Sequence, residues 1–368
     1  MTANQLAAPS PVQTGAHFDI HGLVGIEVAP GTPGAPQLVD MLGPFHTARP
    51  AEEQCRILVT GTTATLVNPS HAEDAYRYSD DTLFLPRERV TVTVTDAGFT
   101  VAGRGELLTA IIPLLDRLCV LNAAAMVHAA IVNYRGAGML MPVWGGVGKT
   151  STVAKLVHIE GVQFMADDWG FLRSDGTVLG YAKPMFIKAH HQPIYPQLFE
   201  GPRKPLVPKG LTKPLERAST MVHPVIVRYP RTAAFTRRWS PEHRMVHPEQ
   251  AFGAENIASE APACVAMFLE RHSGPDAVLE PRSAEWMTTR IVGNFHTELP
   301  GVSRSLIEAL GATGLIPLER YFADKAKVVR RGLGEIPCHV LKLPASWSAD
   351  HASDHVTATV QALLNDWA

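Results

Sequence analysis

Cysteine is scarce in this sequence, and its few cysteines are not paired. The four of them, among 368 residues, lie at positions 55, 119, 264 and 338, with no Cys-x-x-Cys spacing. This pattern excludes a disulfide framework and a zinc site built on neighbouring cysteines. An excess of one charge is also lacking, because 33 basic side chains are balanced by 35 acidic ones. We therefore expect neither a nucleic-acid partner nor an anionic membrane partner.

Long apolar runs are absent as well. The most apolar run, residues 123–132, is too short to span a bilayer and contains His128. The first 15 residues have neither the basic region nor the apolar region of a secretory signal. We therefore expect a cytoplasmic protein without a membrane span. The chain is long enough for two domains, and its 46 % of hydrophobic residues is an ordinary globular content.

The chain divides into three parts by its local signals. Residues 1–16 are small, polar and proline-containing, which predicts a disordered tail. Residues 17–104 show strand signals at 56–59, 63–67, 90–95 and 99–102, with a hairpin turn at 96–98. They predict a small β-rich N-terminal domain, which either helps to form a substrate site or is only structural. Residues 105–368 alternate strand and helix signals and form the third part.

This third part predicts an α/β domain. We expect helices at 106–121, 149–157, 283–294, 303–310, 317–327 and 356–367, where apolar residues recur with helical spacing. We expect strands at 126–132, 139–144, 162–166, 170–173, 177–181, 265–269 and 338–343. Residues 203–238 carry nine Lys or Arg side chains and a single acid, which indicates either a mobile basic loop over phosphates or a solvated surface loop.

A glycine-rich turn lies at the centre of this domain. The apolar run 139–144 predicts a buried strand, the sequence GGVG follows as a turn, and KTS opens a helix. A second apolar run, 162–166, ends in the pair Asp167-Asp168. Strand, glycine turn, Lys-Thr, helix, strand and acid form the layout of a phosphate-binding P-loop, although Val143 stands where the strict motif has its first glycine. The expected nucleotide-binding residues are Gly145, Gly146, Val147, Gly148, Lys149, Thr150 and Ser151.

These residue types suit polyphosphate chemistry. Glycines let consecutive backbone N–H groups form a concave anion site, and the helix adds its positive N-terminal end. Lys149 is expected to contact the outer phosphates, and the hydroxyl of Thr150 to bind Mg²⁺. An acid after the next strand can hold the metal or accept a proton from the nucleophile. The cofactors that we expect are therefore ATP and Mg²⁺.

The same residues resemble a known family. His128 on the strand before the P-loop, the GGVGKTS turn and the Asp167-Asp168 pair resemble the core of HPr kinase/phosphorylase, whose fold is shared in outline with phosphoenolpyruvate carboxykinase. The resemblance covers residues 123–182 well and the rest loosely. It implies an HPr kinase/PEP carboxykinase-like P-loop kinase domain over residues 105–368, with a mixed sheet and flanking helices. The family tends to assemble, so the resemblance leaves a homo-oligomer open, and no interface pattern is visible in the sequence.

The resemblance also implies roles for single residues. Asp167 is expected to be the general base, and His128 and Lys149 to act on the phosphate side as catalytic residues. Asp168 and Thr150 are the expected metal ligands. His128 also suits a core histidine, and the acidic pair also suits a turn cap. The family's short RGLG-like signature is not found near the acidic pair, since the RGLG of this chain lies far downstream at 331–334.

The departure from the family argues against the phosphocarrier protein HPr as the substrate. The better resemblance is to dispersed HPr-kinase-like proteins, some of them associated with lasso peptide tailoring. It implies an ATP/Mg²⁺-dependent serine kinase acting on a hydroxyl of a peptide or a small molecule. Two alternatives stay open, namely a nucleotide-gated P-loop ATPase or GTPase switch and a non-catalytic nucleotide-binding module. Trp144 stands where the partitioning ATPases carry a lysine, which disfavours the switch.

Overall fold

The computed structural model describes residues 15–48, 55–72, 75–103, 107–144, 147–188 and 243–367. Contacts divide the chain into one unit of residues 1–183 and 252–368 and a second unit of residues 184–251. In the second unit, β15 (Met185–Lys188) pairs antiparallel with β16 (His243–Val246), and α7 (Pro248–Phe252) follows. The basic stretch 203–238 and nearly all of the predicted disordered tail lie outside the described residues, so both stay predictions.

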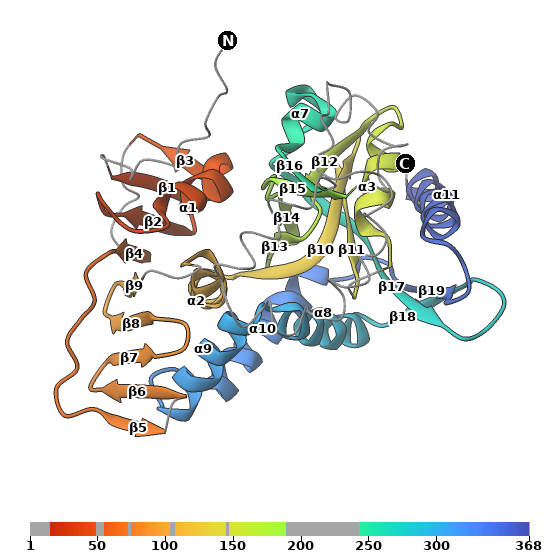
Figure 1. Ribbon diagram of the computed structural model, residues 1–368. Helices are drawn as coiled ribbons and strands as arrows, with labels where there is room; N and C mark the ends of the chain where they lie inside the picture. Colours follow the sequence, from red (N-terminus) through yellow and green to blue (C-terminus); the bar gives the residue numbers. More distant parts are fainter. Residues whose placement is uncertain are drawn as a thin grey trace, which may run out of the picture. The chain divides into compact units, whose positions relative to one another are not determined.

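The first sheet is built entirely from residues 16–103. Its strand order is β3-β1-β2-β4-β9-β8-β7-β6-β5, with parallel pairs at β2–β4 and β4–β9 and antiparallel pairs elsewhere (Figure 1). The expected hairpin is confirmed, since Thr95 pairs with Gly98 across it. The strands are β1 (Ala16–Ile20), β2 (Val24–Val28), β3 (His46–Thr47), β4 (Arg56–Thr60), β5 (Ser70–Ala72), β6 (Tyr76–Ser79), β7 (Thr82–Leu85), β8 (Val90–Thr95) and β9 (Gly98–Gly103).

Two expectations in this region are wrong. Residues 63–67 are not a strand: they are mostly exposed, and β4 already pairs with β2 on one side and β9 on the other. The helix α1 (Ala35–Leu42) was not expected among strand signals. It follows Gly34, whose positive φ of 79° opens the turn, and it buries Ala35, Leu38 and Leu42 at helical spacing. The short helix η1 (Gly43–Phe45) continues it.

Helix α2 (Leu107–Leu121) joins the first sheet to the second, as Figure 1 shows. It contacts β9 and β4 of the first sheet and β10 of the second. Most of its side chains are buried, including Ala110, Ile111 and Cys119, which is the pattern of a helix covered on all sides. One hydrophobic core therefore runs from Phe18 to Phe268. The predicted boundary near residue 104 falls between β9 and α2. The division of the chain into an N-terminal domain and a kinase domain stays a prediction.

The second sheet carries the glycine turn and is mixed. Its order is β11-β10-β13-β14-β17-β19-β18, with β12 also on β10 and β17 also on β11. Strands β11, β17 and β19 are mutually parallel, whereas β10 is antiparallel to β11. The strands are β10 (Ala124–Tyr134), β11 (Ala137–Pro142), β12 (Val162–Ala166), β13 (Trp169–Arg173), β14 (Thr177–Leu179), β17 (Glu260–His272), β18 (Val278–Arg282) and β19 (Cys338–Pro344).

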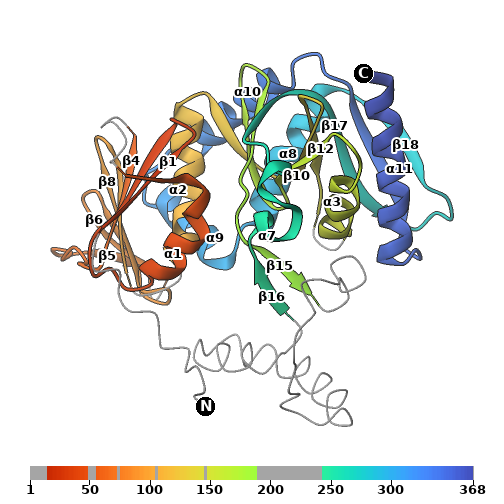
Figure 2. The same cartoon turned by 90° about the horizontal axis from the view of Figure 1, so that it is seen from above.

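The expected elements of this part are confirmed, several of them with longer limits. The helices are α3 (Lys149–Val157), α8 (Ala284–Glu298), α9 (Gly301–Ala312), α10 (Leu318–Leu333) and α11 (Ala349–Trp367). The short helix η3 (Ala254–Asn256) and strand β18 were not expected. Helix α3 packs on β10 and β12, and α11 packs on α3 (Figure 2). The RGLG sequence forms the end of α10. No helix within the described ranges is long and apolar enough to cross a membrane.

Candidate functional site

The glycine turn leads directly into α3, as the sequence predicts. Gly148 caps this helix with φ 98° and ψ 25°, a left-handed conformation that glycine adopts without a steric penalty. Lys149 is the first helical residue, and Val147 before the cap is buried. Gly145 and Gly146 lie outside the described residues. The helix therefore directs its free N–H groups and its positive end at the place where the sequence predicts phosphates.

The hydroxyl of Thr150 contacts the first carboxylate of the acidic pair. Thr150 Oγ1 donates to Asp167 Oδ2 at 2.8 Å. The second oxygen, Asp167 Oδ1, is buried and has no hydrogen-bond partner among the described residues. This contact links α3 to the end of β12, over a sequence separation of 17 residues. Asp167 is thus the acid of the pair that lies beside the hydroxyl expected to bind metal.

The second carboxylate is surrounded by positive and polar groups. Asp168 Oδ1 lies 2.9 Å from His128 Nε2 and 3.6 Å from Lys149 Nζ. Its other oxygen, Oδ2, lies 2.8 Å from Lys183 Nζ. Lys149 Nζ is also 2.7 Å from His128 Nε2. The structure therefore brings together three of the predicted residues, and Lys183 joins them from a segment that carried no functional signal.

A shift in strand pairing positions the acidic pair. Both β12 and β13 pair with the same edge of β10, and Ile131 opposes Ala166 while His128 opposes Trp169. The register shifts by one residue between these pairs and the pair Val132–Phe164. The extra residue, Met165, makes a β-bulge, a feature that commonly redirects side chains near active sites. The acidic pair therefore lies between β12 and β13, which pair one after the other along β10 beside His128. It does not lie at the free end of a strand.

The two carboxylates differ in their proton affinity. Burial raises the pKa of Asp167 to about 6, although Lys149 and the hydrogen bond from Thr150 act in the opposite direction. Burial also acts to raise the pKa of Asp168, but Lys183, the hydrogen bond from His128 and Lys149 outweigh it and hold the pKa well below its usual range. Asp168 is therefore ionised at neutral pH, whereas Asp167 titrates near it.

Asn294 on α8 fixes the two strands that carry the site. It is 2 % exposed, and its Nδ2 donates to the backbone oxygen of His128 at 3.0 Å and to that of Val143 at 3.1 Å. His128 lies on β10, and Val143 lies two residues before Gly145, the first glycine of the turn. The sequence held a signal for this residue, because Met287, Ile291 and Asn294 share one buried helical face.

A buried ion pair between α2 and α10 also supports β10. Asp116 and Lys325 have no exposed side-chain surface, and the Lys325 ammonium lies 2.7 Å from Asp116 Oδ2. The Tyr321 hydroxyl donates to the same carboxylate. The cluster holds both backbone groups of Met126, whose N–H donates to Asp116 Oδ1 at 2.7 Å and whose oxygen accepts from Lys325 at 2.9 Å. Met126 is two residues from His128, so this pair positions the site strand.

The oxygen atoms beside α3 suit Mg²⁺. Thr150 Oγ1 and the unpartnered Asp167 Oδ1 are hard oxygen donors, and Mg²⁺ characteristically takes one or two protein oxygens together with water and phosphate oxygens. In the part of the chain that the structure describes, His, Cys, Asp and Glu side chains nowhere group in threes as a metal cage. The oxygen atoms of Thr150 and Asp167 therefore fit a metal that arrives with a phosphate ligand.

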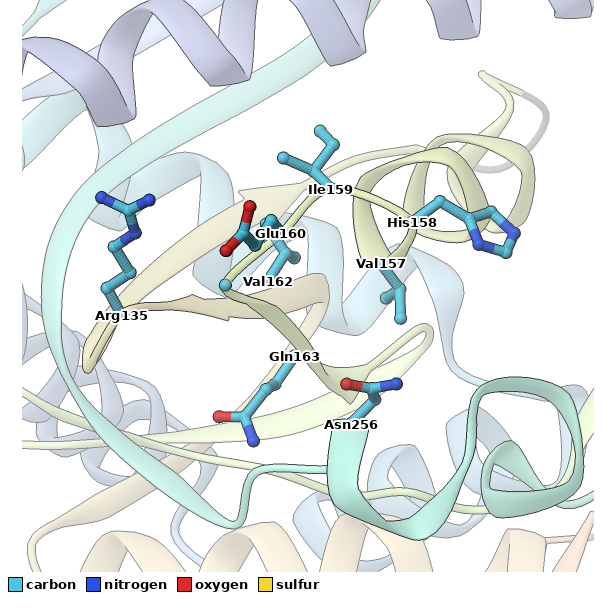
Figure 3. Close-up of a pocket in the computed structure, with 9 residues that line it drawn as sticks. Arg135, Val157, His158, Ile159, Glu160, Val162, Gln163 and Asn256 are labelled. Carbon is cyan, nitrogen blue, oxygen red and sulfur yellow. The ribbon is translucent and has the colours of Figure 1, made fainter.

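Two cavities lie near these elements, and neither contains the acidic pair. A cavity of about 580 Å³ is lined by Arg135, His158, Glu160, Gln163 and Asn256 among others (Figure 3). It lies where α3 ends and β12 begins, the opposite end of β12 from Asp167. A recess of about 30 Å³, lined mainly by apolar side chains from α1, α2 and β10, adjoins Lys183. It is large enough for one water-sized group.

Comparisons with known proteins add little to this geometry. No protein-family profile matches the chain, and no curated protein matches it. Among solved structures it is similar to the HPr(Ser) kinase/phosphatase from Coxiella burnetii, at 10 % sequence identity and a TM-score of 0.27. That likeness covers 66 % of this chain and 94 % of the other. A TM-score this low supports no inference about function.

Proposed function

We propose that this protein is a kinase that transfers the γ-phosphoryl group of ATP, with Mg²⁺, to a hydroxyl group of a peptide or small molecule. Serine is the hydroxyl that we propose for a peptide acceptor. The observation that carries the proposal is the contact of 2.8 Å between Thr150 Oγ1 and Asp167 Oδ2 at the start of α3. It joins a helix N-terminus, a hydroxyl that suits a metal and a carboxylate in one place, as phosphoryl transfer requires.

The phosphate side is formed by the turn and by two lysines. The N–H groups around Gly148 and the positive end of α3 attract the phosphate oxygens. Lys149 and Lys183, whose side chains are 15 % and 18 % exposed, neutralise negative charge that develops on the transferred group. Mg²⁺, which Thr150 and Asp168 would hold in this assignment, would supply further charge neutralisation when it is bound. His128, next to Lys149, is the polar group that we assign to the outer phosphate.

The carboxylates carry the proton chemistry. We assign Asp167 as the general base, because a pKa of about 6 lets it be ionised at neutral pH and still accept a proton. The acceptor oxygen forms a bond to the γ-phosphorus, the bond from that phosphorus to the β–γ bridging oxygen breaks, and the hydroxyl proton passes to Asp167. Asp168 stays ionised and holds His128 and Lys183 in place.

One observation favours an exchange of the two carboxylate roles. Asp167 contacts Thr150 and its free oxygen is buried, whereas the side chain of Asp168 is 37 % exposed and open to an acceptor. In that assignment Asp167 holds the metal, and Asp168 receives the proton. The two assignments are distinguished by the Mg²⁺ concentration that saturates turnover, which rises in the Asp167→Asn variant only if Asp167 is the metal ligand.

Label transfer tests the proposed function. We would incubate the protein with Mg²⁺ and ATP labelled in the γ-phosphate, together with serine-containing peptides and small hydroxyl compounds, and measure label on the acceptor. Lys149→Ala should abolish transfer, whereas Lys327→Ala, which removes a 73 % exposed lysine of α10, should not. Hydrolysis without transfer to any acceptor would support the ATPase or GTPase switch. Absence of nucleotide binding would exclude every nucleotide-dependent function.

We also propose three further properties of this protein. They are kinship with HPr-kinase-like enzymes of lasso peptide tailoring, a cytoplasmic location and a homo-oligomeric assembly. The choice of ATP over GTP or polyphosphate belongs with them, and competition between these donors in the transfer assay would decide it.

A further inference from the structure

The parallel strands of the second sheet end at the same edge as the glycine turn. Strand β11 leads into that turn, β17 ends at His272, and β19 ends at Pro344. Ligands of open α/β sheets bind outside the carboxyl ends of parallel strands. Asp167 and His128 lie on the β12 and β10 side of the turn. The side of the turn that Asp167 and His128 do not occupy is therefore the side toward β17 and β19.

The segment after β19 is held rigidly on that side. Arg271 of β17 donates from Nη1 to the oxygen of Pro344 at 2.8 Å and to that of Trp347 at 3.4 Å. The N–H of Ala345 donates to the oxygen of His272 at 2.7 Å, and the N–H of Trp347 donates to the oxygen of Pro344 at 3.1 Å. These four contacts fix the backbone of residues 344–347 against the end of β17.

The chain then returns to the glycine turn as α11 begins. A Cβ atom added to Gly148 would lie 3.6 Å from the oxygen of Ala349, an ordinary van der Waals distance. Lys155 of α3 lies 2.6 Å from Asp350 Oδ1 and 2.7 Å from Asp354 Oδ1. Figures 1 and 2 both show α11 alongside α3. The start of α11 therefore forms a wall beside the turn.

This wall carries an aromatic cluster. The Trp347 ring lies 4.2 Å from the ring of His351 and 5.3 Å from that of His355, between ring centroids. Trp347 is half-buried, and His351 is exposed. Strand β19 is two strands from β11, a separation of about 10 Å at the usual spacing. A nucleoside triphosphate whose phosphates occupy the turn is long enough to reach across that distance.

We propose that the purine base of the phosphoryl donor stacks on Trp347 and His351. The inference rests on the proposed function, because it requires the donor's phosphates to occupy the turn. Aromatic side chains bind bases through their π-faces, and a purine presents the larger face. The subsite is the aromatic cluster itself, and it makes the protein prefer a nucleotide over inorganic polyphosphate.

Binding of ligands with and without a base tests the subsite. We would measure the Kd of Mg²⁺-ATP and of Mg²⁺-tripolyphosphate, which has no base, by calorimetry for the full-length protein. Trp347→Ala should weaken ATP binding about tenfold and leave tripolyphosphate binding within about twofold. Trp347→Phe, which keeps an aromatic ring, should restore most of the ATP affinity. Lys149→Ala should weaken both ligands, because both use the phosphate site.

The outcomes separate the two proposals. If the wild type binds neither ligand, the proposed function fails and the subsite with it. If the wild type binds both equally, or Trp347→Ala weakens both equally, the phosphate site stands and base stacking on Trp347 is overturned. Trp144, 39 % exposed at the start of the turn and stacked on Arg290 at 5.3 Å, is the competing platform. Loss of ATP preference in Trp144→Ala but not in Trp347→Ala would also overturn the proposal.

Discussion

The Lys149 ammonium lies 2.7 Å from His128 Nε2, the ring nitrogen that also lies 2.9 Å from Asp168 Oδ1. A neutral ring nitrogen either carries hydrogen and donates to Asp168 or lacks hydrogen and accepts from Lys149. The two contacts therefore exclude each other as hydrogen bonds. A phosphate that takes over the Lys149 ammonium removes this competition and leaves the ring to donate to Asp168.

We expect polyphosphate binding to place the His128 hydrogen on Nε2. The measurement is the ¹⁵N shift pattern of the imidazole nitrogens, with His128 assigned by its loss in His128→Gln. On addition of Mg²⁺-tripolyphosphate, Nε2 should move to the pattern of a protonated, hydrogen-bonded nitrogen. An unchanged His128 pattern at saturating ligand would show that Lys149 does not leave the histidine.

Asp167→Asn should separate binding from turnover. The amide keeps the shape of the carboxyl group but cannot accept the hydroxyl proton, so we expect turnover to fall by about 10²–10⁴-fold with a nearly unchanged Kd for nucleotide. Single-turnover transfer and equilibrium binding measure the two effects. Equal losses of binding and turnover would contradict the base assignment.

The pH dependence of transfer should follow Asp167. Its pKa is raised to about 6, so it becomes protonated below that pH, and kcat/KM should fall up to tenfold per unit below about pH 6. The raised pKa has the opposite effect on stability, because the folded state then binds this proton more tightly than the unfolded state. Between the ordinary carboxyl value and about pH 6, this residue's contribution to stability decreases as pH rises. A profile flat to pH 4.5 would refute the assignment.

Asn294→Ala should impair the site without touching the ligand. The change removes the side-chain donor to two backbone oxygens in the buried site, which costs about 1–3 kcal/mol of unfolding free energy, measurable by urea denaturation. It also removes the bridge between His128 on β10 and Val143 before the turn. We therefore expect at least a tenfold lower kcat where the variant remains folded. The matched control is Thr297→Ala on the exposed face of the same helix. Equal effects of the two substitutions on kcat would contradict a positioning role for Asn294.

Lys325→Met should be strongly destabilising. It leaves the Asp116 carboxylate buried without its cation, a loss of about 3–5 kcal/mol that urea denaturation would measure. The double variant Asp116→Asn/Lys325→Met removes the unpaired charge and should recover part of this loss. If the single and double variants are equally unstable, the cost arises from packing rather than from the buried charge.

The local structure around the turn could be predicted from sequence because its signals are local. Gly148 has to adopt positive φ before a helix, and the apolar runs on both sides indicate buried strands. The spacing of apolar residues likewise predicted α2, α8 and α10, and the structure confirms them. The prediction of a strand at residues 63–67 was wrong because a local strand signal does not supply a neighbouring strand to pair with.

The sequence by itself determined that a glycine turn, a lysine, a hydroxyl and an acidic pair occur in the order that phosphate binding requires. Only the tertiary structure decided which acid contacts Thr150, because that depends on the one-residue register shift at Met165. It also brought Lys183, Asn294 and Trp347 to the same edge of the sheet. No periodicity reveals such residues as a group, since they come from separate segments and meet only through strand pairing and helix packing.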